Sequence, residues 1–182
     1  MDLNNSKKII FITGATSGIG EAAANLLSNK YNLILCGRRE ERLLKIKNRL
    51  SKKTEVITLN FDVRSKEDVI DKINSLPDKW KKINILINNA GNAHGLDFID
   101  EGDISDWDKM IDINVKGLLY VTKQVLSFML IQNSGHIINV GSIAGKEVYP
   151  KGNVYCASKF AVDALSEGMR LDLVEKNIKV SQ

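Results

Sequence analysis

The 182-residue chain is poor in cysteine, proline and aromatic residues, with 2 cysteines, 2 prolines and 6% aromatics. Cys36 and Cys156 lie far apart without Cys-x-x-Cys spacing, which argues against a disulfide framework or a metal knuckle and is typical of a reducing compartment. No long apolar run is present, and the N-terminal MDLNNSKK lacks the apolar segment and cleavage site of a secretion signal. These absences predict a cytoplasmic protein without a membrane span.

Charge is not concentrated in any one segment. The 26 Lys and Arg residues exceed the 22 Asp and Glu residues, giving a net charge of +4, but the lysines are interleaved with acids. Because nucleic-acid partners favour a basic block, this distribution predicts small anionic molecules as partners and no nucleic acid. The 43% hydrophobic content suffices for a packed core, and with no linker or repeat the sequence predicts one domain over residues 1–182.

Short apolar runs rich in β-branched residues alternate with segments of helical periodicity. The predicted strands are 8–13, 32–37, 55–60, 83–88 and 136–141, and the predicted helices are 18–29, 40–50, 66–75, 106–132 and 154–176. This alternation predicts an α/β fold, a doubly wound parallel sheet with helices on both faces (a Rossmann fold). An apolar pattern starts again at Ile178, just before the chain ends, so we expect a sixth strand cut short and a truncated C-terminal part.

The first predicted strand runs into a glycine turn, Thr13 to Gly20, and a helical segment follows at once. Glycine permits left-handed dihedrals and close approach of a ligand to the backbone, while the free N–H groups at a helix start attract a pyrophosphate. The turn therefore predicts a phosphate site. The alternative is a tight strand-to-helix connection that binds nothing.

Two arginines, Arg38 and Arg39, follow the second predicted strand. An acidic residue there would accept hydrogen bonds from the ribose of NAD, whereas arginine can pair with the 2′-phosphate of NADP. Arginines at a helix start also oppose the helix dipole, so a bound phosphate would give them a purpose. We therefore predict NADP(H) as the cofactor. A solvated pair neutralised by Glu40 and Glu41 is the alternative.

Tyr155 and Lys159 are four residues apart and so project from one face of a predicted helix. An ammonium group about 4 Å from a phenolate stabilises it by about 4 kcal/mol at an effective dielectric constant of about 20, so Tyr155 could act as acid or base near neutrality. The same spacing is also common on ordinary amphipathic helices. Ser142 follows the fifth predicted strand, where doubly wound sheets bind ligands. Asn114 lies on the apolar stripe of the long helix, where a buried amide needs partners or bends the helix.

These motifs together resemble the short-chain dehydrogenase/reductase family, whose TGxxxGIG pattern matches Thr13 to Gly20 and whose NNAG pattern matches Asn88 to Gly91. The resemblance implies hydride transfer between a nicotinamide and a substrate carbon, with no metal. It also implies that Asn114, Ser142, Tyr155 and Lys159 are catalytic, with Asn114 linked to Lys159 through water. The cofactor-binding residues that it implies are Gly14, Thr16, Ser17, Gly18, Ile19, Gly20, Arg38, Arg39, Asp62, Val63, Asn89, Ala90, Gly91, Tyr155 and Lys159. Taken alone, residues 88–91 are also compatible with a simple Asn-rich turn.

Residues 141–150 and 152–162 are similar to the NADP-dependent 3-hydroxy acid dehydrogenases of this family, which implies a substrate such as serine or allo-threonine. A carbonyl or 3-oxoacyl reductase and a non-catalytic nucleotide-binding module are the alternatives. Family members continue through a further strand, a substrate-covering loop and helices, so a fragment is expected here. They also pair their two long helices across a two-fold axis, which implies a homodimer or homotetramer. Trp107, Phe128 and Phe160 could equally be core residues within one subunit.

Overall fold

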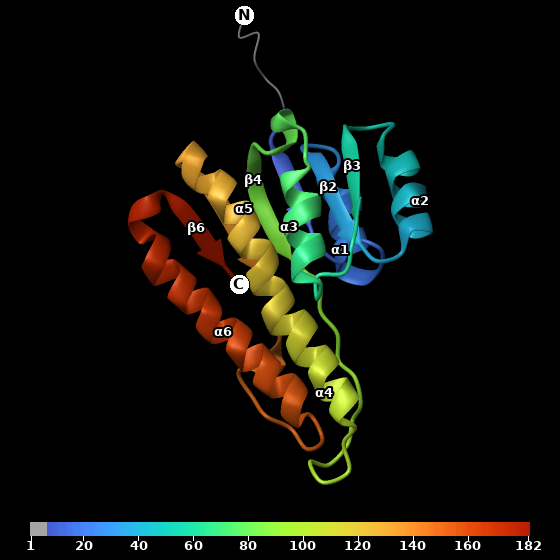
Figure 1. The fold of residues 1–182 in the computed structure, drawn as a ribbon, viewed down its shortest axis with the longest axis vertical. Helices are drawn as coiled ribbons and strands as arrows, with labels where there is room; N and C mark the ends of the chain where they lie inside the picture. Colours follow the sequence, from blue (N-terminus) through green and yellow to red (C-terminus); the bar gives the residue numbers. More distant parts are fainter. Residues whose placement is uncertain (1–6) are drawn as a thin grey trace, which may run out of the picture.

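The computed structural model describes residues 7–182 of the chain, so residues 1–6, which belong to the predicted domain, lie outside the described residues. Six parallel strands form one sheet in the order β3-β2-β1-β4-β5-β6 (Figure 1). The strands are β1 (Ile9–Ile12), β2 (Asn32–Gly37), β3 (Val56–Asn60), β4 (Ile83–Asn88), β5 (Gly135–Asn139) and β6 (Ile178–Ser181). The predicted fold class is confirmed.

The helices follow the strands in alternation, as predicted. They are α1 (Gly18–Leu27), α2 (Glu40–Leu50), α3 (Lys66–Asn74), α4 (Ile104–Ile111), α5 (Leu118–Gln132) and α6 (Asn153–Leu173). None of the helices in residues 7–182 combines the length and the apolar character that crossing a membrane requires.

Alternate residues of the strands supply two hydrophobic layers, one on each face of the sheet. Phe11 points into the layer that α3, α5 and α6 cover, and it is fully buried together with Val125 of α5. Ile10 and Ile12 point into the opposite layer, which α1 and α2 cover through residues such as Ala24 and Leu43. Because every residue of β1 is buried, this strand reads as a continuous apolar run, as expected for a central parallel strand.

The sixth strand is formed by the last apolar pattern of the sequence. Gly135 is paired with Ile178 and Ile138 with Ser181, so β6 continues the parallel sheet beyond β5. β6 has four residues, as many as β1. On the face covered by α1 and α2, Ile85, Ile87 and Ile138 remain half-buried.

The predicted helix 106–132 is wrong as a single regular helix. It begins two residues earlier, at Ile104, where the Asp103 side chain accepts a hydrogen bond of 2.7 Å from the Ser105 N–H. Its middle, Asp112–Gly117, is a π-helical turn that separates α4 from α5. An apolar stripe at helical spacing does not reveal one extra residue in a turn, and such turns occur frequently at functional sites.

Candidate functional site

The order of the strands places the candidate site. The chain winds outward from β1 to β3 in one direction and from β4 to β6 in the other, so the connections leaving β1 and β4 diverge. In doubly wound sheets ligands bind at the carboxyl ends of the strands where this divergence opens a crevice. Both glycine-containing turns that the sequence singles out follow these two strands.

The turn after β1 is held open by its glycines. Gly14 and Gly18 have φ angles of 64° and 56°, in the region that side chains disfavour. A Cβ atom on Gly20 would clash with the carbonyl oxygen of Gly14 and lie 2.5 Å from Nδ2 of Asn89, whereas one on Gly18 would meet nothing within 4 Å. Gly20 is therefore needed for packing beneath the turn, and Gly18 leaves space above it.

The turn after β4 is bonded directly to the glycine turn. The backbone N–H groups of Asn89 and Ala90 donate to the Thr13 hydroxyl oxygen at 3.0 and 2.9 Å. The Asn89 amide donates in return to the carbonyl oxygens of Thr13 and Gly14 at 3.0 and 3.2 Å. These bonds fix the two turns as one unit, which a simple Asn-rich turn would not require.

A cavity of about 660 Å³ lies above these turns. Most of the residues singled out by sequence line it, which brings the phosphate, arginine and tyrosine motifs together. Those lining residues are Gly14, Thr16, Ser17, Gly18, Ile19, Arg38, Arg39, Asp62, Val63, Asn89, Ala90, Gly91, Tyr155 and Lys159. Three others, Gly20, Asn114 and Ser142, are not among the residues that line the cavity.

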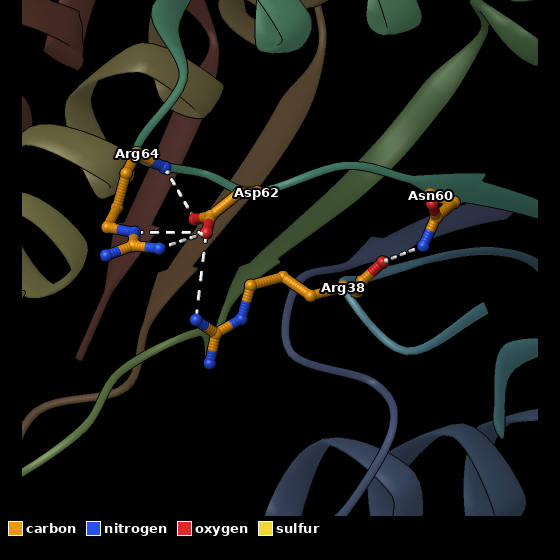
Figure 2. A network of polar contacts seen from close by, with 5 residues as sticks. Arg38, Asn60, Asp62 and Arg64 are labelled. Carbon is orange, nitrogen blue, oxygen red and sulfur yellow. Dashed lines mark hydrogen bonds and ion pairs between the residues drawn. The ribbon is translucent and has the colours of Figure 1, made fainter. Parts of the chain in front are cut away.

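The two arginines differ in how they are held. Arg39 donates to the Thr16 hydroxyl from Nε at 3.1 Å and from Nη2 at 2.7 Å, and Nη2 also donates to the Ser17 hydroxyl at 2.7 Å. Arg38 has an ion pair with Asp62 at 3.7 Å and its side chain is 60% exposed (Figure 2). Neither the hydrogen bonds nor the ion pairs of the described residues join these arginines to Glu40 or Glu41.

Lys159 and Tyr155 lie on the first turns of α6 and face the same cavity. The Lys159 ammonium group donates to the carbonyl oxygen of Val140 at 3.0 Å and lies 6.0 Å from the centroid of the Tyr155 ring. Lys159 is only 8% exposed, and this burial lowers the pKa of its ammonium group below the ordinary value. A lysine that holds its proton less tightly is suited to exchanging protons near a reacting group.

Asn114 lies in the π-helical turn, 2% exposed, and both polar atoms of its amide are hydrogen-bonded. Its Oδ1 accepts from the Asn92 N–H at 2.9 Å, and its Nδ2 donates to the Asn92 carbonyl at 2.8 Å and to the Ser158 hydroxyl at 3.0 Å. The Ser158 hydroxyl donates in turn to the carbonyl oxygen of Tyr155 at 2.7 Å. Asn114 therefore connects the segment after β4 with the helix that carries Tyr155.

Ser142 directly follows Gly141, a residue of the cavity lining, at the carboxyl end of β5. Its hydroxyl caps the short 3₁₀ helix Ile143–Gly145 by accepting a hydrogen bond of 3.2 Å from the Ala144 N–H. Ser142 is therefore next to a lining residue in the chain but does not itself line the cavity.

Several residues that line the cavity were not predicted from the sequence. Cys36, whose thiol has a pKa raised by burial and by the charge of Asp62, lines the cavity as a neutral group. A Cβ atom on Gly37 would lie 2.6 Å from Cγ2 of Thr16, so the second strand must end in glycine to meet the first turn. Asn92 could have been found by its position, directly after Asn88–Gly91. The other lining residues not predicted are Phe61, Ala93, Ile113, Val140 and Gly141.

Comparison with known proteins identifies the family. A family model described as short chain dehydrogenase matches residues 8–182. The chain belongs to the short-chain dehydrogenase family. An NADP-dependent 3-hydroxy acid dehydrogenase, YdfG of Salmonella typhi, is 42% identical over 174 residues, which are 95% of this chain and 69% of that protein.

Solved structures agree with the family assignment, and they include complexes with NADP⁺ and with NAD⁺. The closed form of a serine dehydrogenase complexed with NADP⁺ has a TM-score of 0.89 and 41% identity, over 94% of this chain and 69% of that one. An NAD⁺-bound xylitol dehydrogenase has a TM-score of 0.91 and 33% identity, over 98% and 70%. The shared fold therefore does not decide between the two cofactors. The choice depends on the residues that would contact the adenosine ribose.

Proposed function

We propose that the protein is an NADP-dependent dehydrogenase that transfers hydride between NADP(H) and the hydroxyl-bearing carbon of a 3-hydroxy acid. The observation that carries the proposal is the convergence of the glycine turn, Arg38, Tyr155 and Lys159 on one cavity. The similarity to a 3-hydroxy acid dehydrogenase and to an NADP⁺-bound serine dehydrogenase supports both the cofactor and the substrate class. The described residues act in this proposal as one dinucleotide-binding and catalytic domain.

The residues around the cavity fit the cofactor. The first turn has left-handed glycines and open space over Gly18, which suits a pyrophosphate at the start of α1. Arg38 is exposed and loosely held at the end of β2, where a 2′-phosphate would be placed. Asp62 and Val63 are assigned to the adenine ring, and the Asn89–Gly91 turn to the next part of the dinucleotide.

Each of the catalytic groups has a separate role in this proposal. When bound, the nicotinamide accepts or donates the hydride at its C4 atom. In the oxidising direction Tyr155 takes the proton from the substrate hydroxyl, and in the reducing direction it returns that proton. Lys159 binds the adjacent ribose and stabilises the phenolate, and Ser142 orients the substrate oxygen. Asn114 holds the backbone of Asn92 and, through Ser158, the position of α6.

The test is NADPH formation from NADP⁺ with a panel of L-serine, allo-threonine, simple 3-hydroxy acids and unrelated secondary alcohols. We expect turnover with the 3-hydroxy acids and a strong preference for NADP⁺ over NAD⁺. Turnover confined to the other alcohols would favour the carbonyl reductase alternative, as would NADPH consumption with 3-oxoacyl compounds from a protein that turns over none of the 3-hydroxy acids. A protein that binds NADPH but turns over none of these compounds would contradict the dehydrogenase proposal.

The protein is also proposed to form a homodimer or homotetramer through its long helices. Several large apolar residues of α5 and α6 remain solvent-exposed in the single chain: Leu119 is 38% exposed, Phe160 41% and Leu171 71%. Trp107 and Phe128 are half-buried. An apolar helix face that its own chain leaves uncovered favours association with a second copy. Light scattering of the purified protein would give a mass of two or four chains, and a monomer mass would contradict the proposal.

A further inference from the structure

The carboxylate of Asp62 is approached by two arginines from different elements (Figure 2). Asp62 follows β3, Arg64 lies in the connection from β3 to α3, and Arg38 follows β2. Asp62 and Arg38 line the cofactor cavity, whereas Arg64 is not among its lining residues. Arg64 therefore reaches the carboxylate from outside the site.

The two arginines hold Asp62 very unequally. Arg64 donates to Oδ2 from Nε at 3.0 Å and from Nη2 at 2.7 Å, and its backbone N–H donates to Oδ1 at 3.0 Å. Arg38 approaches with one nitrogen at 3.7 Å, which is beyond good hydrogen-bond distance. Because Arg64 is only two residues away from Asp62 in the chain, forming these contacts costs little conformational entropy. The carboxylate is thus satisfied mainly by Arg64, and Arg38 is left loosely attached.

This inequality matters because of the charges around the cavity. Among the described residues that line it, Arg38, Arg39 and Lys159 are basic and Asp62 is the single acid. Arg39 is already bonded to the hydroxyls of the glycine turn. An unpaired Asp62 would both attract Arg38 and repel an incoming phosphate, since it lies within ion-pair distance of Arg38.

We propose that Arg64 is a positioning residue for cofactor selectivity: by pairing with Asp62 from outside the cavity, it leaves Arg38 available for the 2′-phosphate of NADP(H). The inference rests on the proposed function, because it concerns the same cofactor. It adds a residue that does not touch the cofactor but sets the charge that the 2′-phosphate meets.

The ionisation of Asp62 supports this role. Burial by itself would raise the pKa of the Asp62 carboxyl, but the hydrogen bonds and charge of Arg64, with a smaller contribution from Arg38, hold that pKa below its ordinary value. Asp62 is therefore ionised at neutral pH, and Arg64 balances a full negative charge. Arg64 is 38% exposed, so its replacement is not expected to unfold the protein.

The experiment compares two small ligands that differ in the phosphate at issue. The affinities of adenosine 2′,5′-bisphosphate and of 5′-AMP are measured by titration calorimetry for the wild type, Arg64→Gln and Arg64→Lys. Arg49→Gln is the matched control, because Arg49 forms an exposed ion pair of 2.8 Å with Glu21, and neither residue lines the cavity. No turnover is needed for this measurement.

We expect Arg64→Gln to weaken binding of the bisphosphate about fivefold to tenfold more than binding of 5′-AMP. A difference of this size corresponds to one interaction between partly exposed charges. Arg64→Lys should retain much of the selectivity, and Arg49→Gln should retain all of it. Adding Asp62→Asn to Arg64→Gln should restore the ratio of the two affinities, because the charge that Arg64 balances is then gone.

An unchanged ratio in Arg64→Gln, in a wild type that prefers the bisphosphate, would overturn the role of Arg64 and leave the proposed function standing. Failure of Asp62→Asn to restore a lowered ratio would also overturn it, because Arg64 would then act by another route. A wild type that binds the two ligands equally would overturn the NADP proposal, and the inference about Arg64 with it.

Discussion

Replacing Asn114 by alanine removes the hydrogen bonds that link the segment after β4 to α6. The amide makes three such bonds, two with the backbone of Asn92 and one with the Ser158 hydroxyl. At about 1 kcal/mol for each bond, Asn114→Ala should lower the free energy of unfolding by about 3 kcal/mol. Water entering beside Asn92, which lines the cavity, would reduce this loss, because it can replace some of the lost partners.

The same change should affect turnover more than stability alone explains. Asn114 fixes the backbone of Asn92 on one side and, through Ser158, the carbonyl of Tyr155 on the other. A reacting group displaced by about 1 Å can lose about 100-fold in rate, so we expect a loss of this order in kcat for Asn114→Ala. The measurement is kcat at a temperature well below the unfolding midpoint, together with urea unfolding.

Asn139→Ala is the matched control for this prediction. Asn139 is 1% exposed and also makes side-chain hydrogen bonds, at 2.9 Å to both Asn88 and Ser166, but it does not line the cavity. It should lose about 2 kcal/mol of stability while keeping a kcat near that of the wild type. Equal losses of turnover in the two variants, or a loss of stability below about 1 kcal/mol in Asn114→Ala, would contradict this role of Asn114.

Four further predictions follow from the site. Tyr155→Phe should abolish turnover while NADPH binding, followed by fluorescence, is retained; near-normal turnover would disprove its role in proton transfer. Arg38→Asp should weaken binding of NADPH far more than binding of NADH, and equal losses of affinity for both would exclude a contact with the 2′-phosphate. Gly20→Ala should destabilise the protein by about 1–3 kcal/mol through overpacking against the Gly14 carbonyl oxygen and the Asn89 amide, and wild-type stability of this variant in urea unfolding would contradict the packing role. Gly18→Ala should cost about 1–2 kcal/mol of left-handed backbone strain, and because its methyl group would enter the space proposed for the pyrophosphate, NADPH binding should weaken; an unchanged NADPH affinity by titration would contradict that placement. The pKa of the Asp62 carboxyl is lower in the folded protein than its ordinary value of about 3.9, so the ionised carboxylate stabilises the fold at pH values above about 3.9. The free energy of unfolding of the wild type should therefore exceed that of Asp62→Asn near pH 7, and this difference should be lost as the pH falls below about 4. A difference independent of pH would contradict this prediction.

The alternation of strands and helices was readable from the sequence because each element has a strong local signal. Buried parallel strands such as β1 are short, continuous runs of β-branched and other apolar residues. The glycines of the turn after β1 follow a fixed spacing, which can be recognised in the sequence. The helix boundaries were less well predicted, since capping decides them. The start at Ile104, for example, is set by the side chain of Asp103.

The features that sequence reasoning missed depend on contacts between distant residues. The π-helical turn around Asn114 leaves the apolar periodicity almost unchanged, so the stripe predicted one continuous helix, and only the buried amide of Asn114 allowed for a bend. Arg64 gives no signal by itself, because a basic residue before a helix is ordinary until Asp62 and Arg38 are seen beside it.

The most direct test of the account is to follow the transferred hydrogen itself. The protein would be incubated with NADP⁺ and a 3-hydroxy acid carrying deuterium on its hydroxyl-bearing carbon, and the cofactor would be analysed by mass spectrometry. We expect NADPH that has gained one deuterium from each oxidised substrate molecule. NADPH without deuterium, or no NADPH from any 3-hydroxy acid of the panel, would contradict it.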